Sequence, residues 1–98
     1  MLVELCCKKI AESGKIGWFG AREAKLFCRL YRFQRVSFGD LCVLTGINCF
    51  ALKEMLSDFA KRKLASFDGE KYFLENPLGS LNSIVSLAER DQILLYNR

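Results

Sequence analysis

The stretch Val36–Leu74 constrains the fold of this chain more than any other, because it combines a helical period, a turn signal and a hairpin signal. Asn48 is a candidate helix N-cap, since its side chain can accept a hydrogen bond from the first turn. After it, apolar residues recur at i, i+3, i+4 and i+7, as Leu52, Met55, Leu56 and Phe59. Residues at this spacing share one face, so the pattern predicts a long helix with one buried side.

The residues on either side of this helix predict a shorter helix before it and a β-hairpin after it. The short helix draws its apolar surface from Phe38, Leu41, Val43 and Leu44. Gly46 lies between the two helices, where it can adopt a positive φ and let the chain turn sharply. After the long helix, the apolar runs 64–67 and 71–74 flank Asp68-Gly69-Glu70, which is a hairpin signal. The extended segment 35–37 is expected to add a third strand.

This order of elements is that of a helix-turn-helix followed by a β wing. The residues resemble the winged helix-turn-helix family, especially the small archaeal and bacterial transcription regulators of MarR or ArsR type. The resemblance rests on VSFGDLCVLTGI, on the spacing of Leu52, Leu56 and Phe59, on KRKLASF and on DGEKYFL. It implies an α+β, mostly helical fold: a winged helix-turn-helix with a small hairpin wing and additional N- and C-terminal helices.

A single domain is expected over residues 1–98, because a chain of 98 residues has one small core. Residues 1–20 are predicted to hold a helix over Leu2–Ser13 and a connector in which Trp18 and Phe19 fill a gap or, alternatively, stack on a ligand. The winged core is expected over 21–75, and it begins with a helix over Ala21–Gln34. The core face of that helix is predicted as Leu26, Phe27, Leu30 and Phe33. Residues 76–98 are predicted to form a last helix, capped by Ser80 and reaching about Leu95.

Composition argues against a membrane protein and against an enzyme. No run approaches the ~18 apolar residues that a membrane span needs, and the first residues lack a basic signal-peptide region. We therefore expect a cytoplasmic, intracellular protein. The chain has no histidine, no Gly-rich phosphate loop and no nucleophile–base signature, so neither catalysis nor a cofactor is expected. The net charge of +4 suits an anionic partner, with eight Lys/Arg against four Asp/Glu in residues 1–49.

The five cysteines show no C-x-x-C spacing, so no metal site is expected. We expect them to be free thiols that behave as small hydrophobic residues, without an obligatory disulfide in a mesophilic host. Cys42 and Cys49 bracket the predicted turn and are the pair most worth testing. A bond between them would close a short loop and contribute at most ~3 kcal/mol.

The family resemblance implies a DNA-binding transcriptional regulator. The helix from Asn48 to Lys63 would enter the major groove, and the wing at 64–74 would lie beside the phosphate backbone. The candidates for base readout are Asn48, Phe50, Lys53, Ser57 and Lys61, and those for phosphate contact are Ser37, Arg62, Lys63 and Lys71. Four acidic residues oppose the negatively charged backbone: Glu54, Asp58, Asp68 and Glu70.

Winged helices also serve as protein-docking modules, so a protein-interaction module without strong DNA binding is the alternative. An outward Phe50 fits a protein groove equally well. A basic stripe also invites a phosphate or an acidic partner, although a solvated face explains it as well: Arg22, Lys25, Arg29 and Arg32. The two terminal helices carry more apolar surface than a small body needs, which favours a homodimer.

Overall fold

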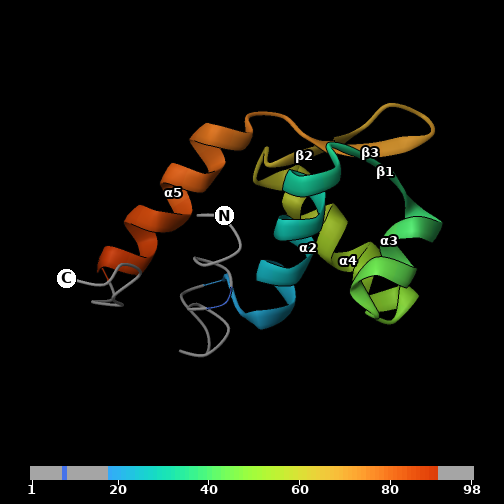
Figure 1. Ribbon diagram of the computed structural model, residues 1–98, viewed down its shortest axis with the longest axis horizontal. Helices are drawn as coiled ribbons and strands as arrows, with labels where there is room; N and C mark the ends of the chain where they lie inside the picture. Colours follow the sequence, from blue (N-terminus) through green and yellow to red (C-terminus); the bar gives the residue numbers. More distant parts are fainter. Residues whose placement is uncertain (1–7, 9–17, 91–98) are drawn as a thin grey trace. The chain divides into compact units, whose positions relative to one another are not determined.

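The computed structural model describes residue 8 and residues 18–90. Within these residues the fold is α+β and mostly helical, as predicted (Figure 1). In chain order the elements are α2 (Ala21–Phe33), β1 (Arg35–Ser37), α3 (Phe38–Thr45), α4 (Cys49–Lys61), β2 (Ala65–Phe67), β3 (Lys71–Leu74) and α5 (Pro77–Arg90). The predicted helix over Leu2–Ser13 and the segment from residue 91 onward lie outside the described residues.

The chain divides into two compact units. One is Arg29–Pro77, and the other combines residues 1–28 with residues 78–98. The boundary falls inside α2, so the predicted core over 21–75 corresponds only approximately to the first unit. That both units form the single expected domain stays a prediction.

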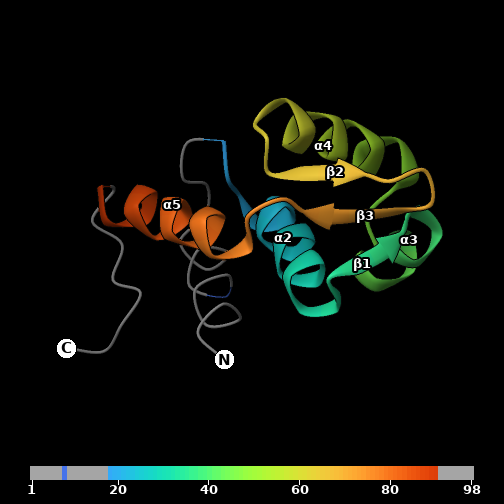
Figure 2. The same ribbon diagram turned by 90° about the horizontal axis from the view of Figure 1, so that it is seen from above.

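The three strands form one antiparallel sheet in the order β1-β3-β2, which confirms the hairpin and the third strand (Figure 2). The central strand β3 pairs on one side with β1, where Val36 faces Tyr72, and on the other with β2, where Ser66 faces Phe73. Val36 and Leu74 are buried and anchor the sheet to the core. Residues 68–70 form the loop that connects β2 to β3.

Side-chain caps fix the connection between α3 and α4. Gly46 ends α3 in the left-handed region, with φ of 66°, and its N–H donates to the carbonyl of Cys42 at 3.0 Å, as the turn prediction requires. Asn48 is the N-cap of α4, as predicted, because its Oδ1 accepts from the N–H of Phe50 at 2.9 Å. The buried Thr45 donates to the carbonyl of Leu41 at 2.6 Å and accepts from the N–H of Ile47 at 3.2 Å. This hydroxyl links the last turn of α3 to the connection.

The predicted core face of α4 is confirmed, since all four of its apolar residues are buried: Leu52, Met55, Leu56 and Phe59. One residue of the apolar surface predicted for the short helix is not buried, and one core assignment in α2 was wrong. Val43 is 83% exposed, because Leu41 and Thr45 form the buried face of α3 and Val43 lies between them on the other side of the helix. Phe33 is 46% exposed, since it is the last residue of α2 and the chain turns away at Gln34, whose φ is 66°.

The helix predicted over Asn48–Lys63 ends earlier, at Lys61. Lys63 adopts a left-handed conformation with φ of 60°, and its N–H donates to the carbonyl of Ala60. The N–H of Leu64 donates to the carbonyl of Phe59 at 2.8 Å. These two bonds form a Schellman motif, which satisfies the last carbonyl groups of the helix and turns the chain toward β2.

α5 begins at Pro77, the last residue of the Arg29–Pro77 unit, whereas Ser80 was predicted as its cap. Proline suits the first position of a helix, because its missing N–H would have no partner there, and Ser80 is instead buried within the helix. Phe19 is fully buried and packs edge-on against Phe27, with ring centroids 6.1 Å apart, so it is a core residue. The first helix, whose gap it was predicted to fill, lies outside the described residues. No helix among residues 18–90 is long and apolar enough to cross a membrane.

Candidate nucleic-acid interface

The α4 face opposite the buried residues is exposed over its full length. Four of the five predicted readout residues lie on this face, Phe50, Lys53, Ser57 and Lys61, and the fifth, Asn48, is exposed at the N-cap that precedes α4. Glu54 lies on the same exposed face. Because the Schellman motif ends α4, Lys63 lies just beyond this face and not on the helix.

Asn48 is the N-cap of α4 and also a predicted base-readout residue, so its side chain would have to serve both roles. Its Oδ1 caps α4 by accepting from Phe50 N–H at 2.9 Å. The amide nitrogen takes no part in this bond, and a carbonyl oxygen has a second lone pair. The side chain is exposed, so it keeps the donor and one acceptor position that an adenine edge would engage.

The predicted phosphate contacts fall into two groups. Lys63 and Lys71 are exposed, like Lys53 and Lys61, and none of these four ammonium groups forms an ion pair with another residue that the structure describes. Arg62, in contrast, donates through Nε to the carboxylate of Asp58 at 3.0 Å. Its guanidinium is therefore engaged on the protein and is a weaker phosphate candidate than the lysines.

Ser37 also has a structural task, because it is the N-cap of α3. Its Oγ accepts from the N–H of Asp40 at 3.2 Å. The hydroxyl proton remains available for donation, since a hydroxyl is both donor and acceptor. Ser37 therefore keeps the capacity for a phosphate contact beside the start of α3.

The tip of the β2–β3 hairpin is organised around Asp68. Its Oδ1 accepts from the N–H groups of Lys71 at 2.8 Å and Glu70 at 2.9 Å, and its Oδ2 accepts from the guanidinium of Arg35. These backbone bonds, followed by the charge of Arg35, hold the pKa of Asp68 below its usual value. Arg35 also lies over the ring of Phe73, with Cζ 4.6 Å from the centroid. The sequence did not indicate this role of Arg35.

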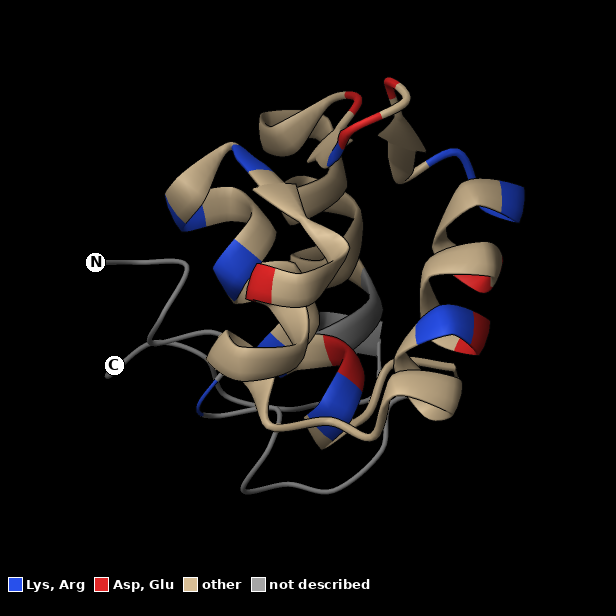
Figure 3. Cartoon of the chain, turned by 90° about the vertical axis from the view of Figure 1, so that its right-hand side faces the viewer, with Lys and Arg blue, Asp and Glu red and all other residues tan. Residues whose placement is uncertain are grey.

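Two of the four acidic residues near the predicted interface are compensated by an arginine. Arg62 neutralises Asp58, and Arg35 neutralises Asp68. Glu54 and Glu70 remain without an ion pair among the residues described, against four uncommitted lysines. Basic and acidic positions consequently alternate on this side of the chain and do not form one basic face (Figure 3).

The predicted basic stripe on α2 combines three exposed cations with one that is partly buried. Arg22, Lys25 and Arg32 are exposed, whereas Arg29 is only partly exposed. The Nε of Arg29 is buried without a hydrogen-bond partner. Arg29 is therefore the least accessible of the four cations.

Cys42 and Cys49 come together across the connection, with their Sγ atoms 3.0 Å apart. Both are free thiols, and so is Cys28. The hydrogen bond with Cys49, then partial burial and the charge of Cys49, raise the pKa of Cys42 above its ordinary value. Among residues 18–90 no group of three potential metal ligands is found.

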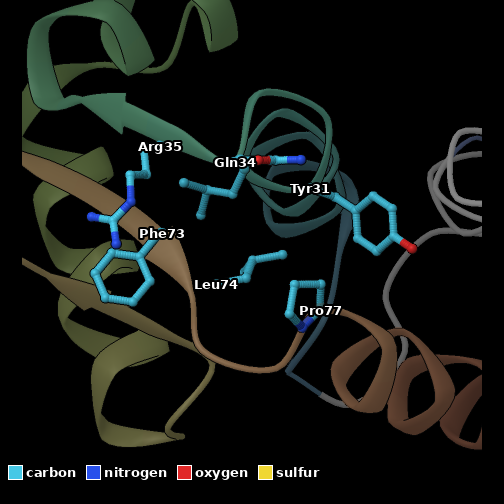
Figure 4. A pocket seen from close by; sticks show the side chains of 7 residues that line it. Tyr31, Gln34, Arg35, Phe73, Leu74 and Pro77 are labelled. Atoms are coloured by element: carbon cyan, nitrogen blue, oxygen red, sulfur yellow. The ribbon is translucent and has the colours of Figure 1, made fainter.

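Two hollows within the Arg29–Pro77 unit were not predicted from the sequence. One, of about 390 Å³, lies between the end of α2 and β3 and is lined by Leu30, Tyr31, Gln34, Arg35, Phe73, Leu74 and Pro77 (Figure 4). The second, of about 340 Å³, is lined by Phe33, Arg35, Val36, Asp40, Val43 and Leu44. Both volumes lie in the range of small-molecule sites, but their few polar groups include Arg35, which Asp68 already engages.

Comparisons with protein-family models, with curated proteins and with solved structures find no match to this chain. The function therefore has to be argued from the site itself.

Proposed function

We propose that the Arg29–Pro77 unit is a winged helix-turn-helix that binds double-stranded DNA, and that the protein acts as a transcriptional regulator. The observation that carries this proposal is the exposed face of α4, which holds Lys53 and Lys61 outward and directly follows the exposed N-cap residue Asn48. The order β1, α3, α4, β2, β3 supports it, because a β-hairpin directly follows the second of two closely connected helices.

In this proposal α4 enters the major groove from its N-terminal end. Asn48 contacts an adenine edge, Phe50 contacts a thymine methyl group, and Lys53 contacts a guanine or a phosphate. Lys61, at the far end of α4, and Lys71, on β3, bind phosphates on the two sides of the groove. The β2–β3 hairpin acts as the wing beside the backbone.

Charge limits the expected affinity. Each phosphate neutralised contributes roughly 0.9 to the slope of log K against log salt. About four to six phosphate contacts per subunit would give a moderate slope, and Glu54 and Glu70 reduce the attraction further. We therefore expect weak nonspecific binding with a moderate dependence on salt.

Fluorescence anisotropy with labelled duplexes tests the proposal. The full chain should bind a random duplex near ~50 mM salt and bind a duplex obtained by selection more tightly. Asn48→Ser is the sharpest variant, because serine keeps the N-cap while the amide donor is lost. It should weaken binding to the selected duplex by about 1–3 kcal/mol and leave the random duplex unchanged. Equal losses on both duplexes would contradict base readout by Asn48.

Docking to a protein is a second candidate, favoured by the 84% exposure of the Phe50 side chain and the 83% exposure of Val43. A large apolar side chain held outward suits a protein groove. If this candidate holds, Phe50→Ala abolishes capture of a protein partner while DNA binding at low salt stays undetectable. If DNA binding holds, Phe50→Ala affects the selected duplex only.

A further inference from the structure

Two thiols meet across the connection between α3 and α4. Cys42 lies in the second half of α3, and Cys49 is the first residue of α4. Their Sγ atoms are 3.0 Å apart. Cys49 is exposed and Cys42 is partly exposed, so a small reagent reaches the pair from solvent.

We propose that Cys42 and Cys49 form a dithiol modification site, which takes a low-molecular-weight disulfide as its substrate and closes into a bridge between α3 and α4. A disulfide bond needs a sulfur separation of about 2.05 Å. The sulfurs therefore have to approach by only about 1 Å from their 3.0 Å contact.

The reaction balances as two thiol–disulfide exchanges. The Cys49 thiolate attacks one sulfur of the small disulfide, which forms a mixed disulfide on Cys49 and releases one small thiolate. Cys42 then loses its proton to solvent and attacks the Cys49 sulfur, which releases the second small thiolate. The two protein thiols lose two electrons, the small disulfide gains them, and the two protons end on the two released thiols.

The structure indicates this order of attack. Cys49 is the more exposed thiol, which makes it the entry point for the reagent. Cys42 holds its proton more firmly than an ordinary thiol does, because its hydrogen bond with Cys49 raises its pKa. Cys42 is then positioned to resolve the mixed disulfide before a second molecule arrives, since its sulfur already contacts that of Cys49.

The test titrates the full chain with mixtures of oxidised and reduced glutathione, followed by rapid alkylation and peptide mass mapping. Cys42 and Cys49 should lose alkylation together and appear as one linked peptide, while Cys28 remains alkylated as an internal reference. The native chain should close this bridge in a less oxidising mixture than the same chain unfolded in urea, because the fold holds the sulfurs together. No DNA is involved, so the result is independent of the proposed function.

Single variants separate the two roles. Cys42→Ser should accumulate glutathione on Cys49, and Cys49→Ser should leave Cys42 largely unmodified. The proposal is overturned if both thiols stay alkylated in every mixture or if the wild type stops at a mixed disulfide. It is equally overturned if native and urea-unfolded chains close the bridge in the same mixture. All three of these outcomes are measured on the wild-type chain, so the proposal remains testable even if a variant does not fold.

Discussion

Arg35 in β1 donates a hydrogen bond to Asp68 at the tip of the β2–β3 hairpin, although 33 positions of sequence separate them. Asp68 also accepts from two N–H groups of its own loop, and Arg35 also stacks on Phe73 of β3. The pair thus joins the strand that precedes α3 to the loop beyond α4. It neutralises a carboxylate on the hairpin that we propose to lie beside DNA.

The first prediction concerns acid stability. The pKa of Asp68 is lowered in the folded chain, so its contribution is complete above the unfolded pKa of about 3.9 and is lost as pH falls through the lower folded value. The urea midpoint of the wild type should therefore decrease below about pH 4. Asp68→Asn should lower the midpoint at pH 5 and weaken its decrease toward pH 3. Glu54→Gln is the control, and an equal effect of both variants would contradict this role for Asp68.

The second prediction concerns the buried hydroxyl of Thr45. Thr45→Val keeps the shape of the side chain but removes the bonds to the Leu41 carbonyl and the Ile47 N–H. The free energy of unfolding should decrease by about 1–3 kcal/mol, since buried polar groups lose their partner. Thr45→Ser retains the hydroxyl and should lower the free energy of unfolding by less than Thr45→Val does. Chemical denaturation measures both, and a neutral Thr45→Val would show that the hydroxyl does not stabilise the connection.

The third prediction compares two lysines at the end of α4. Lys63 has φ of 60°, a conformation in which a side chain is strained by about 1 kcal/mol, whereas glycine adopts it freely. Lys63→Gly should therefore raise the free energy of unfolding by up to about 1 kcal/mol. Lys61→Gly, within the helix, should lower it by about 1 kcal/mol. Both variants lose one positive charge. If both changed the free energy of unfolding in the same direction, the lost charge and not the backbone conformation would be the cause.

Local signals were sufficient to predict most elements of the Arg29–Pro77 unit. The period of Leu52, Met55, Leu56 and Phe59 identified the buried face of α4, and Gly46 and Asn48 identified the connection before it. The exposure of the readout candidates follows from the same period, because the opposite side of a helix with one buried face is exposed. Their role in binding stays a prediction.

The errors arise where the outcome depends on tertiary structure or on a signal that the sequence lacks. Lys63 forms the left-handed end of α4 without the glycine that normally marks it. Val43 looked like a core residue, but the short α3 buries only the face that holds Leu41 and Thr45. The Arg35–Asp68 pair depends on strand register, which spacing along the chain does not reveal.

The fourth prediction concerns assembly, which we propose to be a homodimer formed through the two terminal helices. A two-fold pair would present two copies of α4 to a pseudo-palindromic DNA site. Sedimentation equilibrium at micromolar concentration should give twice the chain mass of 11.2 kDa. A monomer both without and with DNA would contradict the proposal. Leu78, which is 67% exposed on α5, is the first position to substitute, with Leu78→Glu expected to weaken the dimer.

The most direct test of DNA binding is the salt dependence of duplex affinity, measured by anisotropy from ~50 to ~200 mM salt for three chains. The wild type should bind with a clearly negative slope, and Lys61→Gln should bind all sequences more weakly with a slope smaller by about 0.9. Glu54→Gln should bind more tightly, because it removes an uncompensated carboxylate from the α4 face. Undetectable binding of the wild type at ~50 mM salt, or a slope that neither variant changes, would contradict DNA recognition through α4.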